Sequence, residues 1–243
     1  MKKLRKAPIE IYLPIILSII LVTTFIIKTN GKHHVTQPKL KLTPKNTIVV
    51  DTPSIDNPIN VSTKKALFIG DSHTAYANGW QSQLCKKTKM ICINTAVGGK
   101  RTDWMLNVFN KNINSTYEYC FIWGGANDAA SHYYPIEKTI SNIQKMVDSC
   151  NKLGVKPIVL TGFNPELCID ISKQDNRLWG PYIPKYNRLQ SEMLLKLKNC
   201  IVIKNHFITR EDGDCSDFIC HMSASGHKKM AIKIIEYLKF ENF

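Results

Sequence analysis

A serine with the surroundings of a nucleophile follows the first apolar segment of the main part of the chain. The sequence there reads Ile69-Gly70-Asp71-Ser72, and the glycine permits a sharp turn. A serine placed where a buried strand turns into a helix presents its hydroxyl at the top of a sheet. Asp and Ser are also ordinary helix N-cap residues, so the motif alone does not separate a catalytic serine from a cap. Ser72 is a candidate nucleophile whose assignment depends on its partners.

Two later segments supply hydrogen-bond donors. The paired Gly98 and Gly99 allow the backbone to approach a ligand and to direct N–H groups at an anion or a developing oxyanion. Asn127 follows another apolar segment, and its side-chain NH₂ can serve the same purpose, although Asn127-Asp128 also fits an ordinary turn. The glycine segment is not a phosphate loop, because Arg101 stands where that motif needs Ser or Thr after the lysine.

A histidine near the C-terminus completes the set. His221 stands just ahead of the last predicted helix, with Asp217 and Asp214 a few residues before it. An imidazole in this position can act as a general base, held in orientation by a carboxylate. A lone histidine would indicate only packing or a surface role, but four such segments in order indicate acyl transfer. His73 and His227 are also near these motifs, and we interpret both as structural or substrate-facing.

From residue 65 onward, short apolar segments alternate with longer amphipathic ones, which predicts strands and helices wound into a parallel sheet. Helices are predicted over residues 137–153 and 185–198, and a last one begins after Ser223 as N-cap. Because the carboxyl ends of parallel strands share one edge, the four motifs meet there. We expect a three-layer α/β/α fold with a mostly parallel five-stranded sheet. The predicted strands cover residues 66–69, 90–94, 119–123, 157–161 and 201–203.

The blocks Gly-Asp-Ser, Gly, Gly-x-Asn-Asp and Asp…His, in this order, resemble those of the SGNH/GDSL hydrolases, over most of residues 66–240. The resemblance implies that Ser72 is the nucleophile and His221 the base. It also implies an oxyanion hole formed by the backbone N–H groups of Ser72 and Gly99 and by the side chain of Asn127. Gly99 is preferred to the glycine before it because it stands five residues after Asn94, the usual spacing of the family.

The acid of the triad departs from the family pattern. Family members commonly carry Asp-x-x-His, whereas Phe218 stands three residues before His221. We assign Asp217 as the orienting acid, with a disulfide between Cys215 and Cys220 as the means of bringing it into register. Two alternatives stay open: the aspartate seven residues before the histidine, and a Ser-His dyad whose imidazole is held by a backbone carbonyl.

The N-terminal region predicts a membrane anchor. Residues 11–27 carry no charge and are long enough to span a bilayer, and the basic residues within 1–10 favour a cytoplasmic N-terminus. No small-x-small cleavage site follows, so a cleaved signal peptide is the weaker interpretation. Residues 28–64 are interpreted as a proline-containing tether. A short strand over residues 48–50 within it is not included in the predicted sheet. Residues 65–243 then form the catalytic domain of a single-pass membrane protein, outside the cytoplasm.

The cysteines and the charge bound the remaining possibilities. All eight cysteines lie within the predicted domain, where Cys85 and Cys92 are close enough to close a short loop and Cys120 is expected to be a buried thiol. Neither this pair nor Cys215 and Cys220 has metal-ligand spacing, and we predict neither a metal nor a cofactor. The formal charge of +14 is spread along the chain without a basic run interleaved with aromatic residues, which disfavours nucleic acid as a partner.

The resemblance and the anchor together imply an esterase that acts on O-acyl groups, above all O-acetyl groups, of cell-envelope glycans through an acyl-enzyme. An O-acetyltransferase with the same site is one alternative. A catalytically inactive SGNH module that binds a glycan or a partner protein is the other. We expect residues 163–182, which include Trp179 and Tyr182, to supply part of the pocket wall, because long loops at strand ends set specificity.

Overall fold

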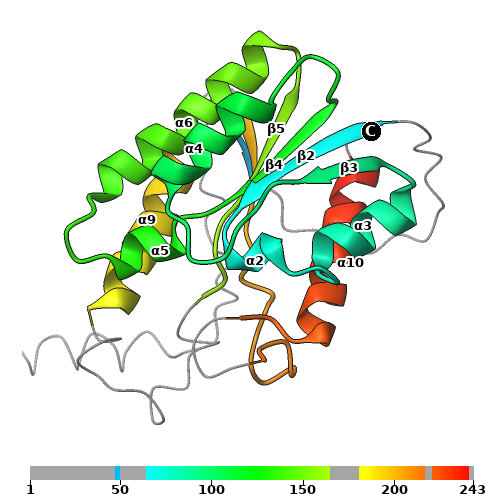
Figure 1. The fold of residues 1–243 in the computed structure, drawn as a ribbon. Coiled ribbons are helices and arrows are strands. Elements are labelled where there is room, and N and C mark those ends of the chain that lie inside the picture. Colours follow the sequence, from blue (N-terminus) through cyan, green and yellow to red (C-terminus); the bar gives the residue numbers. More distant parts are fainter. Residues whose placement is uncertain (1–46, 50–63, 165–180, 217–220, 241–243) are drawn as a thin grey trace, which may run out of the picture. The chain divides into compact units, whose positions relative to one another are not determined.

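The computed structural model describes residues 47–49, 64–164, 181–216 and 221–240, and a parallel sheet forms their centre (Figure 1). The six strands have the order β1-β6-β5-β4-β2-β3, and each pairs in parallel with its neighbours. The strands are β1 (Thr47–Val49), β2 (Lys65–Gly70), β3 (Ile91–Asn94), β4 (Tyr119–Trp123), β5 (Lys156–Leu160) and β6 (Cys200–Ile203).

The sheet contains the five predicted strands and one more. Each predicted strand agrees with β2 to β6 within one residue at either end. The additional strand, β1, lies in the segment that we expected to be a tether, and it pairs with β6 from Thr47↔Cys200 to Val49↔Val202. Its residues Thr47, Ile48 and Val49 are all β-branched, which suits a strand, and their pairing covers what would otherwise be the open edge of β6.

Helices cover both faces of the sheet, which confirms the predicted three-layer α/β/α fold (Figure 1). On one face α3 (Trp80–Thr88) packs against α10 (Ala224–Phe240). On the other face lie α4 (Thr102–Asn112), α6 (Ile136–Lys152) and α9 (Tyr182–Lys196). Two short helices, α2 (Ser72–Ala75) and α5 (Ala126–Ala130), follow directly after β2 and β4. The loops that carry the predicted motifs thus lead into helices, as expected.

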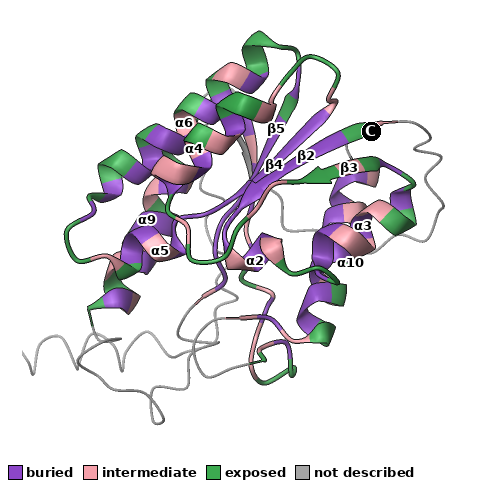
Figure 2. Cartoon of the chain, viewed as in Figure 1, coloured by how far each residue is buried: buried purple, intermediate pink, exposed green. Residues whose placement is uncertain are grey.

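Side chains of the central strands alternate between two hydrophobic cores. Along β4, Cys120 and Ile122 enter the core beneath α4, α6 and α9, whereas Phe121 and Trp123 enter the core beneath α3 and α10. Every residue of β4 is buried (Figure 2). A parallel strand covered on both faces must be apolar throughout, which explains the uninterrupted apolar run in the sequence. The prediction that Cys120 is a buried thiol is confirmed.

The three predicted helices are present with small shifts of their ends. Helix α6 begins one residue earlier than predicted and ends just before Gly154, whose φ of +73° gives the left-handed conformation that commonly follows a helix. Helix α9 begins three residues earlier than predicted. Helix α10 begins after Ser223, whose Oγ accepts the N–H of Gly226 at 3.2 Å, so the predicted N-cap is confirmed.

The connections create a point at which the winding of the sheet reverses. From β2 the chain passes through α3 to the edge strand β3, and then returns through α4 to β4, on the other side of β2. The carboxyl ends of β2 and β4 are therefore adjacent, while the segments that follow them diverge. In open α/β sheets such a switch point is where ligands bind.

The predicted membrane helix over residues 11–27 and most of the predicted tether lie outside the described residues. Within the part of the chain that the structure describes, no helix combines the length and the apolar character needed to cross a bilayer.

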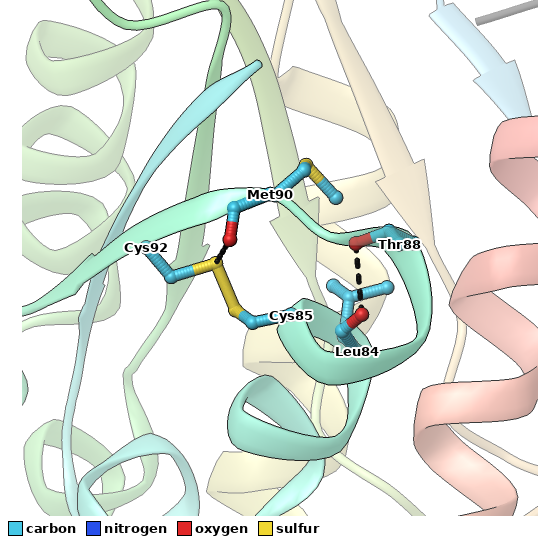
Figure 3. The surroundings of a disulfide bond; sticks show 5 residues. All are labelled: Leu84, Cys85, Thr88, Met90 and Cys92. Carbon is cyan, nitrogen blue, oxygen red and sulfur yellow. Dashed lines mark hydrogen bonds between the residues drawn. A yellow bond between two sulfur atoms is a disulfide. The ribbon is translucent and has the colours of Figure 1, made fainter. Parts of the chain in front are cut away.

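A disulfide joins Cys85 in α3 to Cys92 in β3, as predicted, with 6.3 Å between the two Cα atoms (Figure 3). It closes the turn at which α3 ends, where the hydroxyl of Thr88 also donates to the carbonyl of Leu84 at 2.8 Å. The second predicted pair includes Cys220, which lies outside the described residues. The connection between α3 and the edge of the sheet is thus covalently fixed.

Replacing both Cys85 and Cys92 with serine should lower the free energy of unfolding by about 2 to 3 kcal/mol, because the disulfide restricts a short loop of the unfolded chain. Urea denaturation of the two proteins measures the difference. The control is reductant added to each: it should weaken the native protein to a similar extent and leave the double variant unchanged. An equal stability of the oxidised protein and the double variant would contradict the prediction.

Candidate active site

Ser72 is the first residue of α2, directly after the carboxyl end of β2. Asp71 is the N-cap of this helix, and its side chain accepts the N–H of His73 at 3.1 Å. Gly70 is required by close packing, since a Cβ atom there would lie 2.7 Å from the carbonyl oxygen of Trp123. The turn after β2 therefore lies close against the end of β4, and it carries the hydroxyl of Ser72 at the carboxyl end of the sheet. Both readings of the motif hold, because the aspartate is the cap and the serine remains available for chemistry.

The structure brings His221 to Ser72. The Nε2 atom of His221 lies 3.0 Å from the Oγ atom of Ser72, although the two residues are 149 positions apart in the chain. When the imidazole is neutral with its proton on Nδ1, Nε2 accepts the hydroxyl proton of the serine. This is the geometry in which a histidine activates a serine for attack on a carbonyl carbon.

A small antiparallel bridge holds His221 in this position. Cys215 pairs with Met222, and the carbonyl oxygen of His221 accepts the backbone N–H of Ser216 at 2.8 Å. The N–H of Ser223 then donates to the carbonyl of Asp214 at 2.8 Å, immediately before α10 begins. The histidine is thus fixed between a closed loop and a capped helix.

Of the two candidate acids, Asp214 is engaged elsewhere. It is buried, with one carboxylate oxygen accepting from the hydroxyl of Ser225 at 3.0 Å and the other from Lys229 Nζ at 2.8 Å and the N–H of Thr209 at 3.2 Å. This carboxylate anchors the loop to α10. Asp217 lies outside the described residues, so its assignment as the orienting acid stays a prediction.

The glycine loop after β3 lies against the nucleophile. A Cβ atom on Gly98 would be 3.7 Å from the Cβ atom of Ser72, and the N–H of Val97 donates to the carbonyl of Gly70 at 3.1 Å. Gly99 has a φ of +73°, in the left-handed region that favours glycine. The loop is therefore suited to bring backbone N–H groups close to a reacting group, and the role of Gly99 N–H as a donor stays a prediction.

Asn127, in α5, links the first two motifs. Its Nδ2 atom donates to Asp71 Oδ2 at 3.3 Å and to the carbonyl of Lys100 at 3.2 Å. Gly125 precedes α5 with a φ of +111°, so the turn that aims this side chain depends on a glycine. One amide group thus contacts the nucleophile's turn and the glycine loop, at the switch point between β2 and β4.

Asp128, the residue after it, has a structural role that the sequence did not reveal. Its carboxylate accepts the N–H and the hydroxyl of Thr102, the first residue of α4, and the hydroxyl of Thr139 in α6. Burial raises the pKa of Asp128 above its usual value, while these hydrogen bonds act in the opposite direction. The Asn-Asp pair therefore serves two purposes: the asparagine faces the site and the aspartate locks the helices behind it.

Asp71 is fully buried, and this burial raises its pKa to about 7, against the lowering effect of the hydrogen bonds from His73 and Asn127. The charge of Asp128 raises the pKa of Asp71 further. In the sequence, the position of each carboxylate close after an apolar strand is the only sign that it is buried. A buried carboxylate needs hydrogen-bond partners, and a local sequence pattern does not show which residues these are.

Ser72 and His221 open onto a pocket of about 570 Å³. His73 also lines this pocket. Its ring stacks on that of Trp123 with 4.9 Å between the ring centres, and the ring centre of His221 lies 5.7 Å away. His227 lines the pocket from α10. Both additional histidines are thus next to the site, as the sequence indicated.

The expected pocket wall receives no support from Tyr182. This residue is buried in the core beneath α9, where it stacks on Tyr186 at 5.2 Å between ring centres. Tyr182 is the first residue of α9, and this helix packs its side chain into the core. Trp179 lies outside the described residues. Over the described ranges, no group of three or more His, Cys, Asp or Glu side chains could hold a metal ion.

The fold and the serine–histidine pair at its switch point define a serine hydrolase of the SGNH type. The model of the GDSL-like lipase/acylhydrolase family matches residues 68–229, more than half of the chain, so the chain belongs to this family. Among curated protein sequences, none matches this chain.

Solved structures share the fold at low sequence identity. The acetyl xylan esterase AlAXEase has 18% identity and a TM-score of 0.54, over 72% of this chain and 99% of that chain. A GDSL-like lipase from Bacteroides thetaiotaomicron VPI-5482 has 16% identity and a TM-score of 0.57, over 74% and 89%. A catalytic mutant of an acetylxylan esterase from Geobacillus stearothermophilus has 15% identity and a TM-score of 0.53, over 76% and 97%.

The substitution Asp71→Asn tests the buried carboxylate. The pKa of Asp71 is about 7 in the folded protein, above the ordinary value of 3.8, so the unfolded chain releases this proton at lower pH than the folded chain. Its contribution to stability is complete below pH 3.8 and is lost as the pH rises to about 7, by at most about 1.4 kcal/mol per pH unit. The variant lacks this loss.

The stability of Asp71→Asn relative to the native protein should therefore rise between pH 4 and pH 7 and then level off. Urea unfolding at several pH values measures the difference. The control is Asp148→Asn, which removes a carboxylate exposed to water on α6. A difference for Asp71→Asn that does not change with pH would refute the prediction.

Proposed function

We propose that this protein is a membrane-anchored, extracytoplasmic serine esterase that removes O-acetyl groups from cell-envelope glycans. The observation that carries the catalytic part is the 3.0 Å contact between Ser72 Oγ and His221 Nε2, beside a glycine loop and the amide of Asn127. The substrate, the anchor and the location rest on further support.

In the first half of the reaction, Ser72 Oγ attacks the ester carbonyl carbon and its proton passes to His221 Nε2. The carbonyl oxygen becomes an oxyanion, held by the N–H groups of Ser72 and Gly99 and by Asn127. Because both Nδ2 hydrogens of Asn127 already have acceptors, the oxyanion replaces one of them. The intermediate collapses when His221 returns the proton to the leaving alcohol oxygen, which leaves an acetyl group on Ser72.

In the second half, a water molecule gives a proton to His221 and attacks the acetyl carbon. The bond to Ser72 Oγ breaks, the serine recovers its proton, and acetic acid leaves. Asp217 is proposed to hold the imidazole with its proton on Nδ1 and to stabilise the imidazolium that forms. A sugar hydroxyl in place of the water would give acetyl transfer from the same intermediate.

An acetyl ester of a glycan suits several observations. Two of the structures with the same fold are described as acetyl xylan esterases. The pocket of about 570 Å³ contains hydroxyl, amide and imidazole groups, which suit a polar alcohol such as a sugar. The net charge of +14 favours an anionic polymer as the surrounding material.

The proposed location rests on the N-terminal sequence and on the disulfide. Residues 11–27 form a charge-free run of membrane-spanning length after a basic end. The Cys85–Cys92 disulfide is typical of a domain that folds in an oxidising compartment outside the cytoplasm.

Ser72→Ala should lower the hydrolysis of p-nitrophenyl acetate at least about 10³-fold and abolish labelling by a fluorophosphonate probe, since the nucleophile is lost. The control is Ser191→Ala, which removes an exposed hydroxyl on α9 away from the pocket. Labelling of the native protein but not of Ser72→Ala would exclude the inactive binding module. Undiminished hydrolysis by Ser72→Ala would overturn the assignment of the nucleophile.

Acyl specificity separates the acetyl esterase from other members of its class. With p-nitrophenyl esters of two, four and eight carbons, kcat/KM should fall as the acyl chain lengthens. A maximum at eight carbons would contradict the acetyl assignment. Transfer of the acetyl group to an added glycoside, faster than release of acetate, would favour the O-acetyltransferase.

The anchor is tested with the full chain and with a variant that lacks residues 11–27. The full chain should stay with the membrane fraction after extraction with alkaline carbonate, whereas the deletion variant should be released. A reporter enzyme that is active only outside the cytoplasm, fused to the C-terminus, should be active with the full chain. An inactive reporter would reverse the proposed orientation.

A further inference from the structure

His227 has a fixed tautomer. It lies on α10, lines the same pocket as Ser72 and is only 4% exposed. Its Nδ1 atom accepts the backbone N–H of Trp80 at 3.3 Å. An atom that accepts a hydrogen bond carries no proton, so the proton of the neutral ring resides on Nε2.

The ring is also kept neutral. Burial lowers the pKa of His227 to about 4, and the nearby His221 lowers it further. Trp80 is the first residue of α3, and the positive end of a helix dipole disfavours a cation beside it. At neutral pH His227 therefore presents one N–H donor and no charge.

This donor is not used within the described part of the chain. Across the described part of the chain, Nε2 of His227 has no hydrogen-bond partner, and the atom is accessible to solvent. The residue itself lines the pocket. One face of its ring stacks on Tyr76, at 5.3 Å and 13° between the ring planes. Tyr76 is itself 63% exposed and also lines the pocket. A neutral donor and an exposed aromatic ring thus lie side by side, next to the nucleophile.

The pocket lies on the side of the leaving alcohol. Its described lining includes Ser72 and His221 but neither the glycine loop nor Asn127. An ester whose carbonyl oxygen points at those donors directs its alcohol oxygen toward His221, which must return a proton to it. The alcohol then extends past His221 into the pocket, whose volume of about 570 Å³ far exceeds the needs of an acetyl group.

We propose that this pocket is a subsite for the alcohol part of the substrate, in which Nε2–H of His227 donates to a sugar oxygen while the sugar ring lies against Tyr76. This rests on the proposed function. A neutral donor suits a hydroxyl or ring oxygen, whereas a carboxylate would be better served by a cation. Asn78 and Ser216, which also line the pocket, add further polar groups for hydroxyls. His227 is therefore a positioning residue that selects the alcohol.

Two substitutions distinguish the role of Nδ1 of His227 from the role of Nε2. In His227→Asn, the amide oxygen can take the place of Nδ1 and accept the N–H of Trp80, but the side chain ends short of Nε2. In His227→Gln, the amide nitrogen reaches the position of Nε2 and restores the donor. The matched control is His132→Asn, at an exposed histidine that does not line the pocket.

The readout is the ratio of kcat/KM for methyl β-glucopyranoside acetylated at O6 to kcat/KM for p-nitrophenyl acetate, which has no hydroxyl in its leaving group. His227→Asn should lower this ratio about tenfold through a higher KM for the glycoside, as expected for one lost hydrogen bond. His227→Gln should recover part of the loss, and His132→Asn should leave the ratio at the native value. Tyr76→Ala should also lower the ratio, and its exposed position allows the test even if the histidine variants fold poorly.

An unchanged ratio in both His227→Asn and Tyr76→Ala would overturn the subsite. If His227→Asn lowered kcat/KM equally for both substrates, the role of His227 in the subsite would be overturned, because the loss would show that this residue only supports the packing of α3 against α10. If the native protein hydrolyses neither ester, the proposed function fails instead, so the two failures are distinguishable.

Discussion

The hydrogen bond between Ser72 and His221 joins the turn after a central strand to a loop that precedes the last helix. It can form only if both segments are held to within a fraction of an ångström by groups that do not react. The strand order places Ser72 beside the carboxyl end of β4. The helix that follows His221, α10, packs against α3, which follows Ser72 in the chain. Placement of the reactive pair is therefore a property of the whole winding of the sheet.

Two buried carboxylates provide much of this support. Asp71 caps the helix of the nucleophile and contacts Asn127, while Asp128 fixes the start of α4 and contacts α6. Burial raises the pKa of each carboxyl group, so keeping either one charged costs stability. A polar network of this kind specifies one arrangement of the loops, because any other would leave buried donors and acceptors unpaired.

The central strands were predictable because burial on both faces demands apolar runs, and the site was predictable in outline because its first motifs follow such runs. β1 was not counted, since three residues in a polar segment gain their strand conformation only by pairing with β6. Tyr182 was misplaced because aromatic residues line pockets and cores alike, and only the start of α9 decides between them. The structural roles of Asp71 and Asp128 depend on contacts between distant segments, which no local pattern encodes.

The edge strand β3 has a consequence for how this protein is handled. It ends the sheet, and its residues Ile91 and Ile93 are 51% and 43% exposed. An apolar edge of this kind templates pairing with the edge of another chain, and clipping Cys92 of this strand to α3 limits how far the strand can detach and flatten. Recombinant production in a reducing cytosol would remove the clip and expose the chain to aggregation, so secretion into an oxidising medium is the better route to soluble material.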